Sequence, residues 1–177
     1  MAVETVKDAT IAALDATPRV VPTTGKGAPG MLKVVNGHAT TVASSSDGST
    51  YQLCRVPFSA KVKQVVWESG AQAAGTINVG VYYATDGSNA LSKAALLVAD
   101  TIDEDFFASL LAVTSAIART DITNEGGFYP PSERDLPLWQ AVGLSADPGG
   151  NADIVATVDT ALTTAATEIG LTIFYVD

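Results

Sequence analysis

The side chains that most often carry enzyme chemistry are scarce in this 177-residue sequence. It contains one histidine, His38, and one cysteine, Cys54. A serine hydrolase would need His38 as its base, yet the sequence has no Gly-x-Ser-x-Gly elbow. One histidine and one cysteine also fall short of the four ligands of a structural zinc site. We interpret His38 as an exposed turn residue after Asn36-Gly37 and Cys54 as a buried, inert thiol, and we predict no catalytic residue.

Two further stretches could bind ions or phosphate. The carboxylates between Asp100 and Asp105 could hold calcium, which takes six or more oxygen ligands, but the EF-hand glycine and terminal glutamate are missing. The start of a helix explains the same residues, so a cation there stays an open alternative. Gly25-Lys26-Gly27 lacks the Ser/Thr that follows the lysine of a phosphate-binding loop. The sequence therefore predicts no metal and no cofactor.

The aromatic residues allow a third kind of site, a platform on which sugars stack. Its members would be Trp67, Tyr82, Tyr83 and Trp139. The core of a β-sandwich needs the same large side chains. Clustered, exposed aromatic rings would favour a glycan-binding adhesin module, whereas buried tryptophans would argue against it.

The composition limits the partners. Net charge is −9 and no Lys/Arg cluster occurs, so direct binding to nucleic acid or to anionic membranes is not expected. No segment is long and apolar enough to span a bilayer, and MAVETVKDAT carries no secretory-signal pattern. Charged residues make up only 16%, which indicates that part of the surface is covered by something else.

The elements that would position these residues are mostly strands. Thr76–Tyr83 alternates apolar and polar residues with a period of two, and Tyr51–Val56 and Val62–Trp67 precede it, so we predict three consecutive antiparallel strands. Asn36-Gly37 predicts the turn of a hairpin over 31–43. Further strands are expected at 94–98, 138–145, 153–159 and 168–176, the last one either central in its sheet or buried between subunits. Spacing of apolar residues from Phe106 to Val113 predicts one short helix, and 121–135 is a turn-rich excursion.

Residues 1–30 differ from the rest. A weak helix is expected at 5–16, followed by a Pro/Gly-rich tract that cannot form a packed core. The aliphatic residues in this segment predict an arm that orders on a neighbouring subunit, with these candidate contact residues: Val6, Ile11, Leu14, Val20 and Val21. The fold prediction is all-β: an extended N-terminal arm over 1–30, and a β-sandwich or jelly-roll-like knob over 31–177 with one short helix.

Several blocks resemble small structural proteins of tailed bacteriophages, in the same order along most of the chain. The blocks are LDATPRV (Leu14–Val20), STYQLCRVPFSAKVKQV (Ser49–Val65), AAGTINVGVYY (73–83), DEDFFAS (Asp103–Ser109), LPLWQAVGLSADPGG (Leu136–Gly150) and the closing FYVD. Gln52 and Cys54 stand where the family pattern has Arg and Ala. The family contributes no catalytic residues.

The resemblance implies a capsid decoration, or cement, protein on the outer surface of the phage head. Its partners would be the major capsid protein and itself, as a homotrimer, and it would stabilise the expanded shell. Another virion part, such as a head fibre, a tail component or an adaptor, is the second alternative, and the glycan-binding adhesin module is the third.

Overall fold

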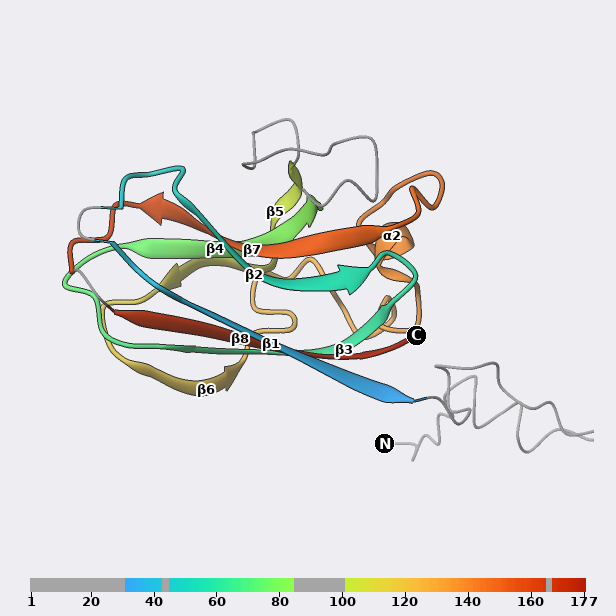
Figure 1. The fold of residues 1–177 in the computed structure, drawn as a ribbon, viewed down its shortest axis with the longest axis horizontal. Coiled ribbons are helices and arrows are strands. Elements are labelled where there is room, and N and C mark those ends of the chain that lie inside the picture. The colour runs from blue at the N-terminus through green and yellow to red at the C-terminus, as the bar shows by residue number, and fades with distance from the viewer. Residues whose placement is uncertain (1–30, 43–44, 85–100, 165–166) are drawn as a thin grey trace, which may run out of the picture. The chain divides into compact units, whose positions relative to one another are not determined.

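The computed structural model describes residues 31–42, 45–84, 101–164 and 167–177. Residues 32–177 form one compact unit of two four-stranded antiparallel sheets, packed face to face (Figure 1). The first sheet has the order β1 (Leu32–Thr40), β8 (Glu168–Val176), β3 (Lys61–Ser69), β6 (Ile117–Asp121). The second sheet has the order β2 (Thr50–Pro57), β7 (Asn151–Thr160), β4 (Thr76–Tyr83), β5 (Thr101–Ala112). The all-β sandwich predicted from the sequence is confirmed.

Alternation along the strands builds the core between the two sheets. On β8, Ile169, Leu171 and Ile173 point inward, and β8 lies between β1 and β3, which confirms the prediction of a central strand. On β4, the inward residues Ile77 and Val79 are fully buried. Burying one large aliphatic or Phe side chain contributes about 1.5–3 kcal/mol, so a core of this size stabilises the sandwich without disulfides. The largest buried side chains are Trp67, Tyr129, Phe58, Phe106 and Phe107.

The strands predicted at 51–56, 62–67 and 76–83 exist, but they do not pair with one another. β2 and β4 belong to the second sheet and β3 to the first, so the chain changes layer after Pro57 and again after Ser69. A period of two fixes which residues share a face, and it carries no information about which strand is the neighbour. The prediction of three consecutively paired strands is wrong for that reason.

The predicted hairpin at 31–43 is also wrong. β1 runs without a turn through Asn36 and Gly37, because nine successive residues pair with β8. An ideal Cβ on Gly37 would lie 1.7 Å from the Leu53 carbonyl oxygen. This glycine therefore permits a close crossing of β1 over β2 and does not make a turn.

The stretch predicted as a helix at 106–113 lies in β5 up to Ala112. Val79 pairs with Ala108 and Val81 with Asp103, so two steps along β4 span five along β5, and β5 carries the extra residues in an irregular bulge. The bulge lets the adjacent rings of Phe106 and Phe107 both enter the core, which a regular strand would forbid. Apolar residues on a bulged strand thus imitate helical spacing.

Among the described residues, the only helix is α2 (Leu138–Ala141), inside the segment predicted as the strand 138–145. Pro137 precedes it, and Leu138 is fully buried. The strand prediction was wrong because Leu138 packs into the core from a single helical turn. Strands β6, which was not predicted, and β7, which was, complete the two sheets.

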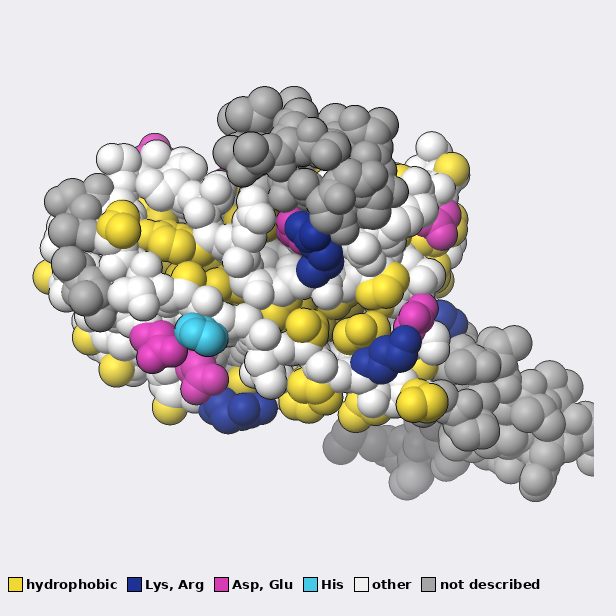
Figure 2. Space-filling model, in the orientation of Figure 1, with side chains coloured by type: hydrophobic (Ala, Val, Ile, Leu, Met, Phe, Trp, Pro, Cys, Tyr) yellow, Lys and Arg dark blue, Asp and Glu magenta, His cyan; other side chains and the backbone are white. Residues whose placement is uncertain are grey.

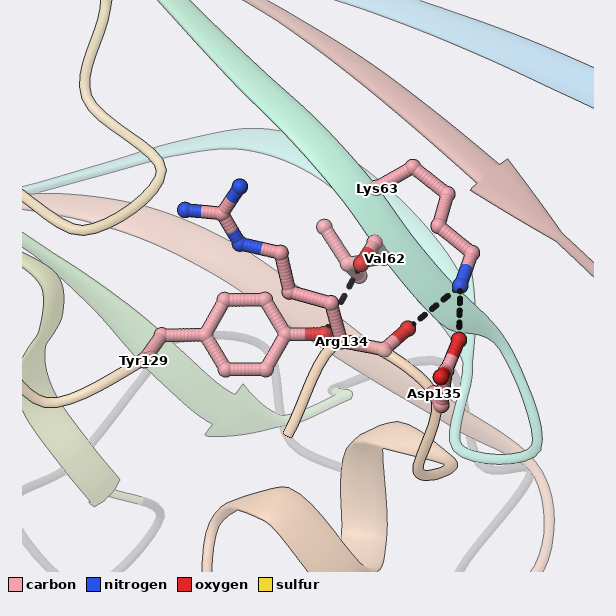
Figure 3. A network of polar contacts seen from close by, with 5 residues as sticks. All are labelled: Val62, Lys63, Tyr129, Arg134 and Asp135. Atoms are coloured by element: carbon pink, nitrogen blue, oxygen red, sulfur yellow. Dashed lines mark hydrogen bonds and ion pairs between the residues drawn. The ribbon is translucent and has the colours of Figure 1, made fainter. Parts of the chain in front are cut away.

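The turn-rich segment that follows β6 is confirmed and is anchored on β3. The Tyr129 hydroxyl donates to the Val62 carbonyl oxygen at 2.8 Å, and burial raises the pKa of Tyr129. The Lys63 ammonium donates to the Arg134 carbonyl oxygen at 2.6 Å and to Asp135 Oδ1 at 3.0 Å (Figure 3). These contacts hold the segment against the end of the sandwich that carries α2.

Some predictions fall on residues that the structure does not describe. These are the arm over 1–30 with its helix at 5–16, and the strand at 94–98. Within the described ranges, no helix is long and apolar enough to cross a membrane.

Candidate partner-binding face

The outward face of the first sheet carries the most distinctive surface among the described residues. Because Ile169, Leu171 and Ile173 point into the core, the alternate residues of β8 point outward. They run from Glu168 at one end to Val176 at the other. The sheet face is therefore polar at one end and apolar at the opposite end.

The apolar end combines the edge strand β1 with the end of β8. Leu32 and Val34 are 59% and 51% exposed. Their paired neighbours on β8 are Val176 and Phe174, both half-buried. Exposed aliphatic side chains that lie side by side, rather than singly, mark an interaction surface.

The polar end is a hollow of about 530 Å³. Its lining includes His38, Glu68, Ser69, Arg119, Glu168 and Gly170. Figure 2 shows the chain's one histidine, in cyan, against acidic side chains in magenta, with a basic side chain in dark blue next to them. Hydrophobic side chains, in yellow, continue along the same face.

Two glycines explain why the sheet is hollowed here. Gly170 pairs with His38 on one side and with Glu68 on the other, so these two side chains flank a position that has none. Neighbouring strands are about 4.8 Å apart, which puts the backbones of His38 and Glu68 roughly 10 Å from each other. One step along, the Gly70 amide donates to the Glu168 carbonyl oxygen, and Gly70 adds no side chain either. The hollow is thus a floor of glycine backbone with charged walls.

The charged walls have no partners inside the described part of the chain. The side chains of His38, Glu68, Arg119 and Glu168 are exposed and make no hydrogen bond or ion pair there. Ser69, also in the lining, is 8% exposed, and its hydroxyl oxygen is buried without a hydrogen-bond partner. Ser69 pairs with Ile169 and follows Trp67 on the inward face of β3, so this hydroxyl lies on the core side of the sheet.

The residues singled out in the sequence lie apart from one another. His38 is exposed, as predicted, but on a strand and within this hollow. Cys54 is buried as predicted, and burial raises the pKa of its thiol to about 12. The arm residues Val6, Ile11, Leu14, Val20 and Val21 lie outside the described residues.

The aromatic residues do not form a sugar platform. Trp67 is fully buried, and Tyr82 is 2% exposed with its hydroxyl 2.7 Å from that of Thr157. Tyr83 and Trp139 are half-buried and pack against the core. The burial of Trp67 argues against the glycan-binding alternative.

The acidic stretch is part of β5 and is held by the protein's own donors. Asp105 Oδ2 accepts from the Ser109 hydroxyl at 3.0 Å, and Glu104 Oε1 accepts from the Asn78 amide at 2.9 Å. Burial, and next the hydrogen bond with Asp105, raise the pKa of Asp103. Asp100 lies outside the described residues, and within them no group of three or more ligating side chains is placed to hold a metal.

No sequence pattern singles out Glu68, Arg119 or Glu168. They come from β3, β6 and β8, which are far apart in the chain and meet only in the sheet. A glycine inside the apolar strand at 168–176 was the one available signal, because glycine in a strand often marks a close approach.

Comparison with known proteins shows the fold. No family model matches the chain, and no curated protein matches it. One similar solved structure is a chain of the "Cyanophage Pam1 capsid asymmetric unit", with 17% identity, a TM-score of 0.50, and coverage of 92% of this chain and 96% of that chain. Another is a chain of the "Capsid of Ralstonia phage GP4", with 14% identity, a TM-score of 0.53, and coverage of 90% and 92%.

Proposed function

We propose that this protein is a structural component of a tailed-phage capsid, a decoration protein that binds the outside of the head and stabilises the expanded shell. The observation that carries this proposal is the similarity of nearly the whole chain to chains of two phage capsids. Because each alignment covers similar shares of both chains, the matched chains are close to this one in length. The likeness is therefore to a small capsid chain as a whole.

The described surface supports the same function. The protein offers a sheet face with an apolar end and an unpaired charged hollow, which suits contact with another protein. Its described residues assemble no nucleophile–base pair, and the lone histidine has no side-chain partner among them. A non-enzymatic, structural role accounts for both features.

Decoration stabilises a shell by mass action. A protein that binds only the expanded, assembled shell shifts the equilibrium toward that state. In our proposal the protein is a homotrimer, so that three weak contacts act together and raise avidity. The segment 1–30 is the arm that reaches the shell, with Val6, Ile11, Leu14, Val20 and Val21 as its apolar contacts.

The test is co-sedimentation of the purified protein with undecorated, expanded shells, scored for copies bound per shell. We expect saturable binding at a copy number that fits the symmetry of the shell. Absence of binding, with labelling at a single vertex or at the tail, would instead assign the protein to another virion part, such as a head fibre, tail or adaptor component.

Deletion of residues 1–30 tests the arm in the same assay. We expect the remaining chain, 31–177, to keep the far-ultraviolet circular dichroism of the sandwich and to lose shell binding. Unchanged binding by this deletion variant would remove the arm from the mechanism while leaving the decoration function intact.

A further inference from the structure

We infer that the hollow on the outer face of the first sheet is a receptor for a lysine or arginine side chain presented by the outer surface of the capsid shell. This inference rests on the proposed function and names the chemistry of the contact. The hollow is formed by His38, Glu68, Ser69, Arg119, Glu168 and Gly170.

The charge of the hollow selects a cation. Glu68 and Glu168 lie on neighbouring strands of one face, and neither carboxylate has a side-chain partner among the described residues. The lining holds the carboxylates of Glu68 and Glu168, the imidazole of His38 and the guanidinium of Arg119, so the carboxylates outnumber the permanent cation two to one. Arg119 can balance one of the two carboxylates, and the other can accept one additional basic side chain. A charge-assisted hydrogen bond to a carboxylate is about twice as strong as a neutral one.

The shape of the hollow admits a long side chain. Its floor is the backbone at Gly170, over which the Glu68 side chain leans: an ideal Cβ on Gly170 would lie 3.1 Å from Glu68 Cγ. A lysine or arginine stem can lie along such a floor with its charged end between the carboxylates.

Arg119 determines which group of the ligand would lie beside its basic side chain. With its guanidinium in the lining, the hollow also offers donors, which a backbone carbonyl or a carboxylate beside the basic residue would accept. The expected ligand is thus a polypeptide segment with a basic side chain next to an acceptor oxygen. The apolar end of the same face, Leu32 and Val34, lies on the same strand as His38 and would extend the contact beyond the hollow.

The experiment uses the full chain and undecorated, expanded shells. The first variant, Glu68→Gln with Glu168→Gln, removes both carboxylate charges and keeps the side-chain shapes. Its matched control, Asp47→Asn with Glu133→Gln, removes two negative charges outside the hollow. We expect the first variant to bind shells at least about tenfold more weakly and the control to stay within about threefold of the wild type.

A second variant tests the shape and not the charge. Gly170→Val fills the floor, and its nearest obstacle is the flexible Glu68 side chain, so the fold is expected to persist. We expect it to weaken shell binding to a similar extent with both carboxylates present. Thermal unfolding of each variant verifies that it is folded.

The outcomes separate the two proposals. Absence of wild-type binding would overturn the proposed function, and this inference with it. Wild-type binding together with unchanged binding of both hollow variants would overturn the inference alone and would move the contact to another surface. Loss of binding in both hollow variants, with the control unaffected, would support the inference.

Discussion

Substitution of Gly37 by alanine tests the crossing of β1 over β2, on which the layer order depends. An alanine Cβ at this position would lie 1.7 Å from the Leu53 carbonyl oxygen and 2.4 Å from its carbonyl carbon. Ordinary contacts begin near 3.4 Å, and both atoms belong to the backbone, so one strand has to move away from the other. Overpacking of this kind costs about 1–3 kcal/mol, and we expect about 3 kcal/mol because no side chain can rotate to relieve the contact.

Alanine substitutions at two other glycines serve as controls for the loss of stability. Gly170 pairs with His38, the residue after Gly37. An alanine Cβ at Gly170 would meet only the flexible Glu68 side chain, so Gly170→Ala should cost less than about 1 kcal/mol of folding stability. Gly48 has a φ of 78° with no atom within 4 Å, so Gly48→Ala should cost about 1–2 kcal/mol from the left-handed backbone alone.

The assay is urea unfolding of the three variants, and the expected order of destabilisation is Gly37, then Gly48, then Gly170. In a thermal melt, about 3 kcal/mol corresponds to roughly 6–12 °C for a domain of this size. A loss at Gly37 no larger than that at Gly48 would indicate an exposed turn at Asn36-Gly37, and it would refute the crossing of β1 over β2.

The remaining predictions concern titratable groups. Burial raises the pKa of Cys54 to about 12, so a thiol reagent at pH 8 should label the native protein only at the rate of unfolding; rapid labelling would contradict the buried position. Burial, and then Asp105, raise the pKa of Asp103, so this group stabilises the fold when protonated and loses that contribution as pH rises through its folded-state pKa. Asp103→Asn should therefore raise the unfolding temperature at pH 7, and the gain should vanish below about pH 3.9, where the wild-type carboxyl is protonated in both states. An equal effect of Asp103→Asn at both pH values would show that the titration of Asp103 is not its cause.

Much of the fold follows from local patterns in the sequence. Alternation identified β4, β7 and β8, because a strand with one buried face needs apolar residues at every second position. The residues Asp147-Pro148-Gly149-Gly150 have the composition of a turn, and Gly149 and Gly150 both have positive φ before β7 begins. The scarcity of catalytic side chains and the acidic balance likewise required no structure.

The errors share one physical cause, which is that tertiary packing can override a local pattern. Asn36-Gly37 has turn chemistry, but pairing with β8 over nine residues keeps β1 straight. Phe106 and Phe107 follow helical spacing, but a bulge lets a strand bury both rings. Leu138 reads as a strand residue, but one helical turn is enough to deliver it to the core.

The hollow could emerge only from the three-dimensional structure. Glu68, Arg119 and Glu168 lie on strands far apart in the chain, and their meeting depends on the order β1-β8-β3-β6. The sequence by itself determined which residues face the core, since side-chain periodicity is a local property of the backbone. Which strands become neighbours is set by how the two layers close on each other, and that closure places the charged side chains around Gly170.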